Sequence, residues 1–456
     1  MLGFTYYTPT KVAFGKGSVE RVGELMKQFG GTRVLIHYGG QSAVRSGVLD
    51  RVKKSLDEAG IFHVELGGVV PNPHLAKERE GIELSKANGV DFLLAVGGGS
   101  VIDSCKAIAY GLAEPEHDVW ELYAGQRKAK ACFPVASVLT IAAAGSEMSN
   151  SCVITNTDTE EKRAYDDDLA RPKFAIMDPE LTMTLPDYQT EAGCADIMMH
   201  TMERYFVNSG TMELTDALAE GLLRTVMHNA EVLHTDPRNY DARAEVMWAS
   251  SLAHNGLTGC GSDGGDWMPH LLEHEMGGMF NVTHGASLAA VWPSWARYVY
   301  KDCLPRFVKY AVNVMGVTPG ATDEETALAG IAAMEEQLAL LPPESEQAQA
   351  LAAQIAGMRT TYEEKSAELA FGKQQADAAA EKLAASAQTL AAGETALAAG
   401  RADYEAGRAE YEKNKASFDK GKAEGAEKLA DAERAAETGR WMEGIQRRGD
   451  GCAGGY

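Results

Sequence analysis

The sequence predicts an α/β N-terminal dinucleotide-binding domain with a parallel sheet, an all-α metal-binding domain and a long helical extension. Short apolar runs alternate with helical patterns over residues 1–185. Helical spacing without a convincing strand fills residues 186–337, and a heptad repeat runs through residues 345–437. Strands that alternate with helices are typical of parallel sheets covered by those helices. We expect residues 438–456 to be a disordered tail.

In the first domain, apolar segments predict strands and amphipathic segments predict the helices between them. The expected strands are residues 32–38, 62–66 and 91–99, and the expected helices are 47–60, 74–89 and a further helix after residue 99. Strands that are apolar along almost their whole length belong to parallel sheets with both faces buried. In the second domain, residues 190–230 and 242–258 show helical spacing instead.

The third segment resembles a coiled coil. Residues 345–437 are rich in Ala, Glu, Lys and Gln and contain no proline. Large apolar side chains recur every seven residues, at Leu383, Leu390, Leu397, Tyr404, Tyr411 and Phe418. Such a repeat predicts a long helix with one apolar seam facing a partner helix. Both a solvated helical spacer and a module that binds a helical partner are consistent with it.

The composition favours a globular protein that binds neither nucleic acid nor a membrane surface. The 456 residues carry a formal net charge of −22, which repels phosphate backbones and anionic lipids. No run of about eighteen apolar residues occurs, and the N-terminus lacks the apolar core of a signal peptide. The seven cysteines are scattered without a C-x-x-C pair, as is typical of free thiols. We therefore expect a cytoplasmic protein.

Two glycine-rich turns follow predicted strands in the first domain. The sequence GGGS at residues 97–100 ends an apolar strand and directly precedes a helix, and Gly39 and Gly40 end another strand. Glycines let the backbone approach a ligand, and a helix N-terminus offers free N–H groups to phosphate. The G-x-G-x-x-G fingerprint is absent, and either turn alone is compatible with a simple strand-to-helix connection. Two such turns in one parallel sheet favour a dinucleotide.

The residues after the second turn indicate NADP(H). Ser42 and Arg45 follow the glycine pair, and no Asp or Glu lies there to bind a ribose 2′-hydroxyl. A hydroxyl beside a cation suits a 2′-phosphate instead.

One carboxylate and three imidazoles indicate a metal site in the second domain. Asp196 and His200 are four residues apart, so they share one face of a helix. His270 and His284 are fourteen apart, and the glycine pair at 277–278 predicts a turn between two helices. Such a set suits Fe(II), Zn(II) or Mn(II). Any one of these histidines alone is more often a hydrogen-bonded core or surface residue, so the prediction rests on the joint pattern.

The same region also contains a metalloprotease string. Residues 270–274 read H-x-x-E-H, in which two histidines hold zinc and a glutamate activates water. That interpretation predicts peptide hydrolysis without a nucleotide, and it leaves both glycine turns and the Asp196/His200 pair without a role. We therefore favour the four-ligand site, in which His270 pairs with His284 and not with His274.

Five longer segments occur in a characteristic order: GGGSVIDSCKAIA, VLTIAAAGSEMS, FAIMDPELTMTLP, DIMMHTMERY and HLLEHEMGGMFNVTHGASLA. Together they resemble the iron-containing (group III) alcohol dehydrogenase family. The YGGQS turn is most similar to its NADPH-dependent butanol dehydrogenase and aldehyde reductase branch. The resemblance covers residues 1–337. Beyond them the heptad segment replaces the family's further helices, so we expect an incomplete helical domain.

The resemblance implies a role for each matching residue. The positions that match the family's metal ligands are Asp196, His200, His270 and His284. His274 matches a histidine that lines the substrate site without binding the metal. The positions that match cofactor contacts are Asn72, Gly97, Gly98, Ser100, Asp103, Thr140, Ser149 and Lys162. The implied active site lies in the cleft between the two domains.

These residues predict a metal-dependent oxidoreductase that transfers a hydride between NADP(H) and a primary alcohol or aldehyde. One Fe(II) or Zn(II) would polarise the substrate oxygen, and the nucleotide would carry the hydride. His274 would relay the alkoxide proton or orient its neighbours. We expect a homo-oligomer. The alternative is a dehydrogenase-derived chain with impaired catalysis, whose residues 345–437 serve as a scaffold or interaction module.

Overall fold

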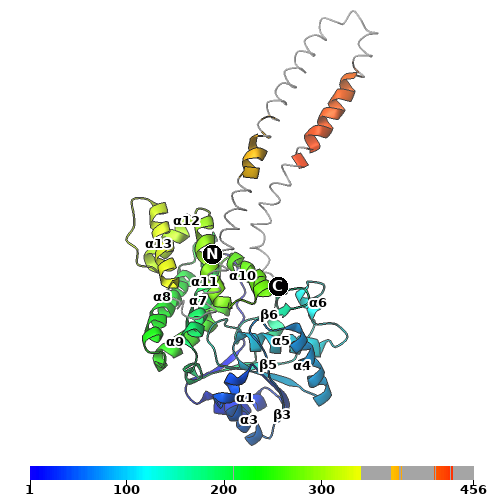
Figure 1. The fold of residues 1–456 in the computed structure, drawn as a ribbon, viewed down its shortest axis with the longest axis vertical. Coiled ribbons are helices and arrows are strands. Elements are labelled where there is room, and N and C mark those ends of the chain that lie inside the picture. Colours follow the sequence, from blue (N-terminus) through cyan, green and yellow to red (C-terminus); the bar gives the residue numbers. More distant parts are fainter. Residues whose placement is uncertain are drawn as a thin grey trace, which may run out of the picture. The chain divides into compact units, whose positions relative to one another are not determined.

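The computed structural model describes residues 1–208, 210–339 and short stretches farther along the chain (371–378, 380, 382, 415, 417–431 and 433–434). The described residues fall into two units, one of residues 1–339 and one of the stretches between residues 371 and 434. The predicted α/β and helical regions both lie in the first unit (Figure 1).

A six-stranded sheet forms the centre of the α/β region. Its strands are β1 (Lys11–Phe14), β2 (Arg33–Tyr38), β3 (Phe62–Leu66), β4 (Phe92–Gly97), β5 (Val135–Leu139) and β8 (Phe174–Met177). Neighbouring strands pair in parallel in the order β1-β8-β5-β4-β2-β3. The predicted strands 32–38, 62–66 and 91–99 correspond to β2, β3 and β4, so the predicted parallel sheet is confirmed.

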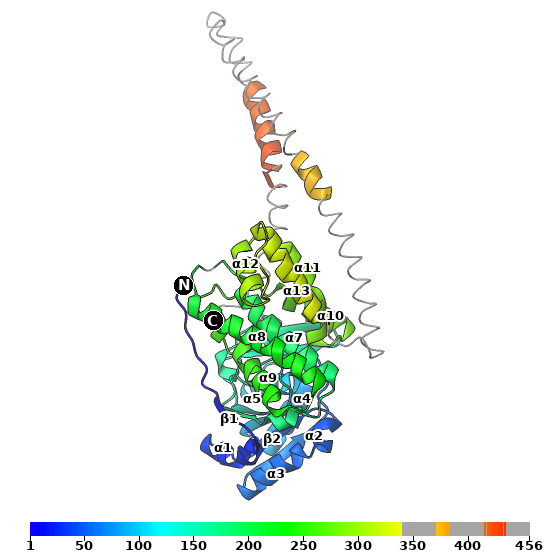
Figure 2. The same ribbon diagram turned by 90° about the vertical axis from the view of Figure 1, so that its left-hand side faces the viewer.

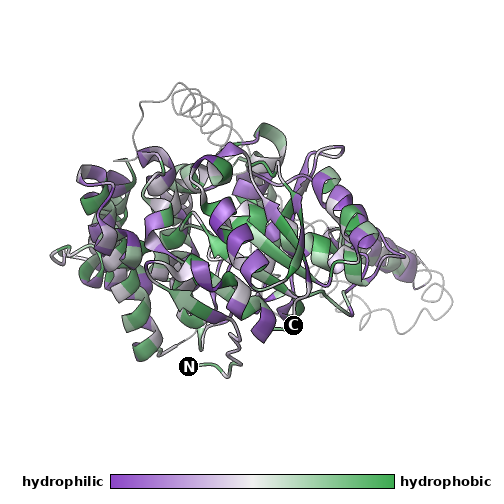
Figure 3. Cartoon of the chain, turned by 90° about the horizontal axis from the view of Figure 1, so that it is seen from below, coloured by the Kyte–Doolittle hydropathy of each residue, from purple (hydrophilic) through white to green (hydrophobic). Residues whose placement is uncertain are grey.

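Helices cover both faces of this sheet (Figure 1). They are α1 (Val22–Gln28), α2 (Gln41–Arg45), α3 (Val48–Glu58), α4 (Leu75–Asn88), α5 (Gly99–Ala113) and α6 (Trp120–Tyr123). Strand β4 shows why both faces are apolar. Phe92, Leu94 and Val96 lie in one core with α1 and α3, whereas Leu93 and Ala95 lie in another with α4 and α5. Successive strand residues point to opposite faces, and Figure 3 shows the hydrophobic strands between the helices.

The strand order reverses between β2 and β4. From β2 the chain continues to β3 on one side and then returns to β4 on the other side. Ligands of open α/β sheets bind at such a switch point, beyond the carboxyl ends of the strands. Gly39 follows β2 and Gly97 ends β4, so the two glycine turns flank this point.

An antiparallel strand pair that the sequence did not predict lies beside the sheet. Strand β6 (Ser151–Asn156) contacts α5, and β7 (Glu161–Asp166) contacts a helix of the second region, α10 (Met268–Phe280). The pair therefore connects the α/β region to the helical region.

The described residues from 187 to 339 form helices without a strand, as predicted. They are α7 (Asp187–Tyr205), α8 (Glu213–Thr235), α9 (Tyr240–His254), α10, α11 (His284–Val299), α12 (Leu304–Asn313) and α13 (Asp323–Leu338). Helices α7, α8 and α9 lie side by side (Figure 2). The stretch 190–230, where helical spacing was predicted, contains most of α7 and the larger part of α8.

The second unit is described only in part. Residues 371–378 and 417–431 are helical, and Phe371 and Leu429 are exposed. The heptad positions from 383 to 411 lie outside the described residues, so the coiled coil stays a prediction. Among the residues that are described, no helix is both long enough and apolar enough to cross a membrane.

Candidate active site

Three of the four predicted metal ligands meet at one point. Asp196 lies on α7, His270 on α10 and His284 at the start of α11, and each offers a ligand atom within 4.8 Å of the other two. Asp196 Oδ1 is 3.6 Å from His270 Nε2 and 3.5 Å from His284 Nε2. Asp196 Oδ1 and His270 Nε2 are buried and have no hydrogen-bond partner. Buried atoms without a partner fit a divalent metal, which would accept a lone pair from the oxygen and one from the nitrogen.

The fourth predicted ligand, His200, lies beside this group but not within it. Its Nδ1 is 3.1 Å from Asp196 Oδ1 and contacts the Asp196 carbonyl oxygen at 3.0 Å. Its ring centre is 4.4 Å from that of His270. The four-residue spacing therefore predicted the shared helix face, and the structure assembles three of the four ligands.

The buried titratable groups in this cluster shift one another's pKa values. Burial alone would raise the pKa of Asp196, but His200 and His284 hold it well below its usual range. Burial lowers the pKa of His200 to about 4. Burial would also lower the pKa of His270, but Glu203 and Asp196 raise it to about 9. An oxygen that stays anionic beside imidazole nitrogens has the chemistry of a cation site.

Two buried glutamates that were not predicted as site residues contact the histidines. Glu203 on α7 accepts a hydrogen bond from His270 Nδ1 at 2.6 Å, and Glu273 on α10 lies 2.5 Å from His284 Nδ1. Both carboxylates are fully buried. A carboxylate on one ring nitrogen leaves the other nitrogen free for a metal. Each glutamate reaches a histidine of another helix, so spacing along the chain gave no signal for these pairs.

This geometry does not support the metalloprotease interpretation. That motif requires His270 and His274 as ligands, whereas the group contains His270 with Asp196 and His284. Glu273 is engaged by His284 and by Lys162, whose Nζ lies 2.8 Å from it. A carboxylate with two such partners is not placed to activate water.

His274 lies next to the cluster on α10, with its ring centre 6.4 Å from that of His284. Burial lowers the pKa of His274 well below its usual range, and Lys162 lowers it further.

Two more aromatic rings that the sequence did not indicate border the cluster. His254 stacks on His200 at 4.0 Å between ring centres, and Trp267 lies 5.5 Å from His270.

The glycine pair at 277–278 does not form the predicted turn. Both residues lie inside α10, which ends at Phe280, and the chain turns at Asn281, whose φ is 51°. A Cβ on Gly278 would lie 2.4 Å from the Glu160 carbonyl oxygen, and one on Gly277 would lie 3.0 Å from Lys162. The glycines therefore allow strand β7 and the residue before it to pack against the helix.

The glycine turns of the α/β region adjoin helix N-termini. Gly98 precedes α5, which begins at Gly99 and carries Ser100 in its first turn. Gly40 precedes the short helix α2, and both Ser42 and Arg45 are exposed there. The first turn of α5 leaves backbone N–H groups without helical acceptors, which suits a pyrophosphate.

Several predicted cofactor residues already have protein partners. Lys162 binds Glu273, and Asn72 donates to Asn281 Oδ1 at 2.9 Å and to the Val282 carbonyl oxygen at 3.2 Å. Three more of them contact nearby backbone or side chains: Asp103 accepts from Ser146 and Val153, Thr140 N–H donates to the Gly97 carbonyl oxygen, and buried Ser149 accepts from Ser151 N–H. A nucleotide contact by Lys162 or Asn72 therefore replaces or supplements these bonds.

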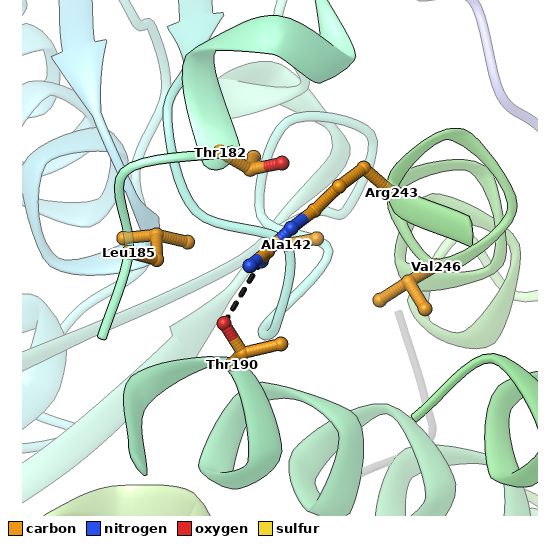
Figure 4. Close-up of a pocket in the computed structure, with 6 residues that line it drawn as sticks. All are labelled: Ala142, Thr182, Leu185, Thr190, Arg243 and Val246. Carbon is orange, nitrogen blue, oxygen red and sulfur yellow. Dashed lines mark hydrogen bonds between the residues drawn. The ribbon is translucent and has the colours of Figure 1, made fainter. Parts of the chain in front are cut away.

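A separate pocket is lined by Ala142, Thr182, Leu185, Thr190, Arg243 and Val246 (Figure 4). Arg243 donates from Nη1 to Thr190 Oγ1 at 2.8 Å, and its buried Nη2 has no protein partner. The six lining residues include none of the predicted site residues.

Comparisons with known proteins agree along most of the chain. Residues 9–179 match the sequence profile "Iron-containing alcohol dehydrogenase", and residues 190–384 match "Fe-containing alcohol dehydrogenase family, C-terminal". NADH-dependent butanol dehydrogenase A of Clostridium acetobutylicum is 44% identical over 72% of this chain and 84% of its own length. The NADPH-dependent aldehyde reductase YqhD of Escherichia coli is 38% identical over 74% of this chain and 87% of its own length. The crystal structure of NADH-dependent butanol dehydrogenase A from Thermotoga maritima superimposes with a TM-score of 0.74 at 39% identity, covering 77% of this chain and 87% of that one.

A parallel sheet with glycine turns at its switch point, joined to a helical region whose Asp-His-His cluster could hold a metal, fits the class of nucleotide-dependent oxidoreductases. The chain belongs to the iron-containing alcohol dehydrogenase family. NAD(P)H and a divalent metal are the cofactors typical of that family. The C-terminal profile extends to residue 384, so the family match continues past residue 337, where the resemblance was expected to stop.

Proposed function

We propose that this protein transfers a hydride between NADP(H) and a primary alcohol or aldehyde, with one Fe(II) or Zn(II) at Asp196, His200, His270 and His284. The observation that carries the proposal is the buried group of Asp196, His270 and His284, whose orphan oxygen and nitrogen face one another. The names of the relatives point to the substrate class, since they are butanol dehydrogenases and an aldehyde reductase.

Bound metal supplies Lewis-acid polarisation of the substrate oxygen, and bound nicotinamide supplies or accepts the hydride. The residues of the chain hold and orient these groups. Asp196 and the imidazoles hold the metal, and the N-terminus of α5 binds the pyrophosphate. His274, one helical turn from His270, passes the alcohol proton between the substrate oxygen and solvent.

Ser42 and Arg45 support NADP(H) as the nucleotide. Both are exposed beside the Gly39–Gly40 turn, where they would meet the adenosine ribose. The relatives divide on this point, because one is named for NADH and another for NADPH. Parallel assays with the two nucleotides decide it: a higher kcat/KM with NADPH supports the proposal, and a higher value with NADH contradicts the assignment of Ser42 and Arg45.

A single assay tests the proposed reaction. The absorbance of NADPH is followed with a medium-chain aldehyde, with and without a chelator, for the full chain, for His270→Ala and for the control His228→Ala. His228 is an exposed residue of α8. We expect chelator-sensitive turnover in the full chain and in His228→Ala. His270→Ala should lose bound metal and turnover together, and unchanged turnover in metal-free protein would refute the proposal.

A further inference from the structure

Glu273 is a buried carboxylate with two nitrogen partners from distant parts of the chain. Its Oε2 is 2.5 Å from His284 Nδ1 on α11 and 2.8 Å from Lys162 Nζ on β7. The side chain of Glu273 is fully buried and that of Lys162 is 5% exposed. One carboxylate therefore joins a metal ligand of the helical region to a strand of the α/β region.

The local backbone is shaped to keep these three groups together. Gly277 and Gly278 lie where β7 packs against α10. A Cβ on Gly277 would lie 3.0 Å from Glu273 Oε1 and 3.0 Å from Lys162. Lys162 Nζ also lies 3.0 Å from Glu273 Oε1 and 3.5 Å from His284 Nδ1, so the three groups form one buried cluster. Removing one member therefore leaves its buried partners less compensated.

Because Glu273 accepts from His284 Nδ1, the ring is held with Nε2 directed at Asp196 Oδ1, 3.5 Å away. Glu203 acts on His270 in the same way, from Nδ1 at 2.6 Å. The difference is that Glu273 also binds Lys162, one of the residues expected to contact the nucleotide. The same oxygens thus serve both the metal ligand and a cation on the nucleotide side.

We propose that Glu273 is a positioning residue that holds His284 for the metal and Lys162 for the nucleotide, and so links the two binding equilibria. The inference rests on the proposed function. When Lys162 turns to the nucleotide, Glu273 is left to His284 alone and accepts from it more strongly. Bound nucleotide should therefore raise the affinity for the metal. Linkage is reciprocal, so bound metal should raise the affinity for the nucleotide by the same factor, about 5- to 100-fold.

The test measures Co(II) affinity by equilibrium dialysis and the visible Co(II) spectrum, and NADPH affinity with and without Co(II). The proteins are the full chain, Glu273→Gln, Lys162→Met, the double variant and the control Glu275→Gln. Glu275 is exposed on the same helix. Loss of a carboxylate behind a metal-bound histidine lowers metal affinity about 10- to 100-fold. We expect that loss and an altered spectrum in Glu273→Gln and the double variant, but not in Lys162→Met or Glu275→Gln.

The double variant keeps the test decisive, because it removes both charges and leaves neither one buried alone. If Glu273 only balanced Lys162, the double variant would regain wild-type Co(II) affinity, and the inference would be overturned. Equal NADPH affinity with and without Co(II) in the full chain would overturn the linkage. Failure of the full chain to bind Co(II) at all would instead refute the proposed metal centre.

Discussion

At the scale of single residues, a substitution of His274 tests whether the proposed proton transfer can be separated from metal binding. This histidine lies one turn from His270 but outside the ligand group. We expect His274→Ala to keep its metal and to lower kcat about 100-fold, as is usual when a general acid–base group is lost. Metal content and turnover of the purified variant check this. Bound metal lost in His274→Ala would make it a ligand, and unchanged kcat would remove it from the mechanism.

Glu78 is a buried carboxylate outside the active site, and it should make stability depend on pH. It is fully buried on α4, its two carboxylate oxygens have no hydrogen-bond partner among the described residues, and burial raises its pKa to about 7. In the unfolded chain it ionises near pH 4.5, so only the unfolded state loses the proton between those values. The folded protein therefore loses stability as pH rises from about 4.5 to 7, by about 3 kcal/mol, and regains none above that.

Glu78→Gln should abolish this loss. The thermal midpoint of the variant, relative to the unchanged protein, is expected to be higher at pH 8 than at pH 5. His37, whose pKa is lowered to about 4 by burial, has the opposite dependence, but it is present in both proteins and cancels. The exposed Glu80→Gln on the same helix is the control. A pH-independent difference for Glu78→Gln would show that this carboxylate ionises normally in the fold.

At the scale of elements, the closeness of α7 and α11 positions His284. A Cβ on Gly285 would lie 1.9 Å from the Ala192 carbonyl oxygen. We expect Gly285→Ala to separate the two helices and to cost about 1–3 kcal/mol of unfolding free energy. It should also weaken metal binding, because His284 is the preceding residue. Gly221→Ala on α8 is the matched control. It meets no atom within 4 Å, so it should stabilise by about 1 kcal/mol through helix propensity. Equal midpoints for the two variants would contradict the close approach.

The elements that the sequence predicted best are those with an unmistakable period. The central strands β2 and β4 are apolar on both faces, and a parallel sheet is the arrangement that buries both. Strand β7, EKRAYD, was not predicted because its charges resemble a loop. Its backbone hydrogen bonds are made with β6. Its Lys162 forms an ion pair with Glu273, on a helix about a hundred residues later in the chain. Only tertiary structure supplies such partners.

The residues of the candidate site were likewise predicted where local spacing is enough and missed where tertiary packing decides. The four-residue spacing of Asp196 and His200 predicted a shared helix face, and the helical fold delivers it. The glutamates behind the histidines were not predicted as site residues, because an isolated Glu in a helix is usually solvated. Glu203 reaches His270 on a different helix, sixty-seven residues away. Pairings across helices depend on packing, which local spacing does not encode.

At the scale of the whole molecule, the proposed metal site joins parts that are far apart in the chain. Its candidate ligands come from α7, α10 and α11, and Glu273 connects them to β7 of the α/β region. An ion that binds only this folded arrangement must stabilise it, by about 3 kcal/mol at a hundredfold excess over its dissociation constant.

Metal removal should therefore lower the thermal midpoint of the whole protein. We expect a chelator to lower it by about 5 °C and added Zn(II) or Fe(II) to restore it. His270→Ala should not respond to either addition, because it removes one of the three residues whose ligand atoms meet at one point. Differential scanning calorimetry with each addition measures the response. If His270→Ala responds as strongly as the unchanged chain, the stabilising ion binds elsewhere, and the three-helix group is not the metal centre.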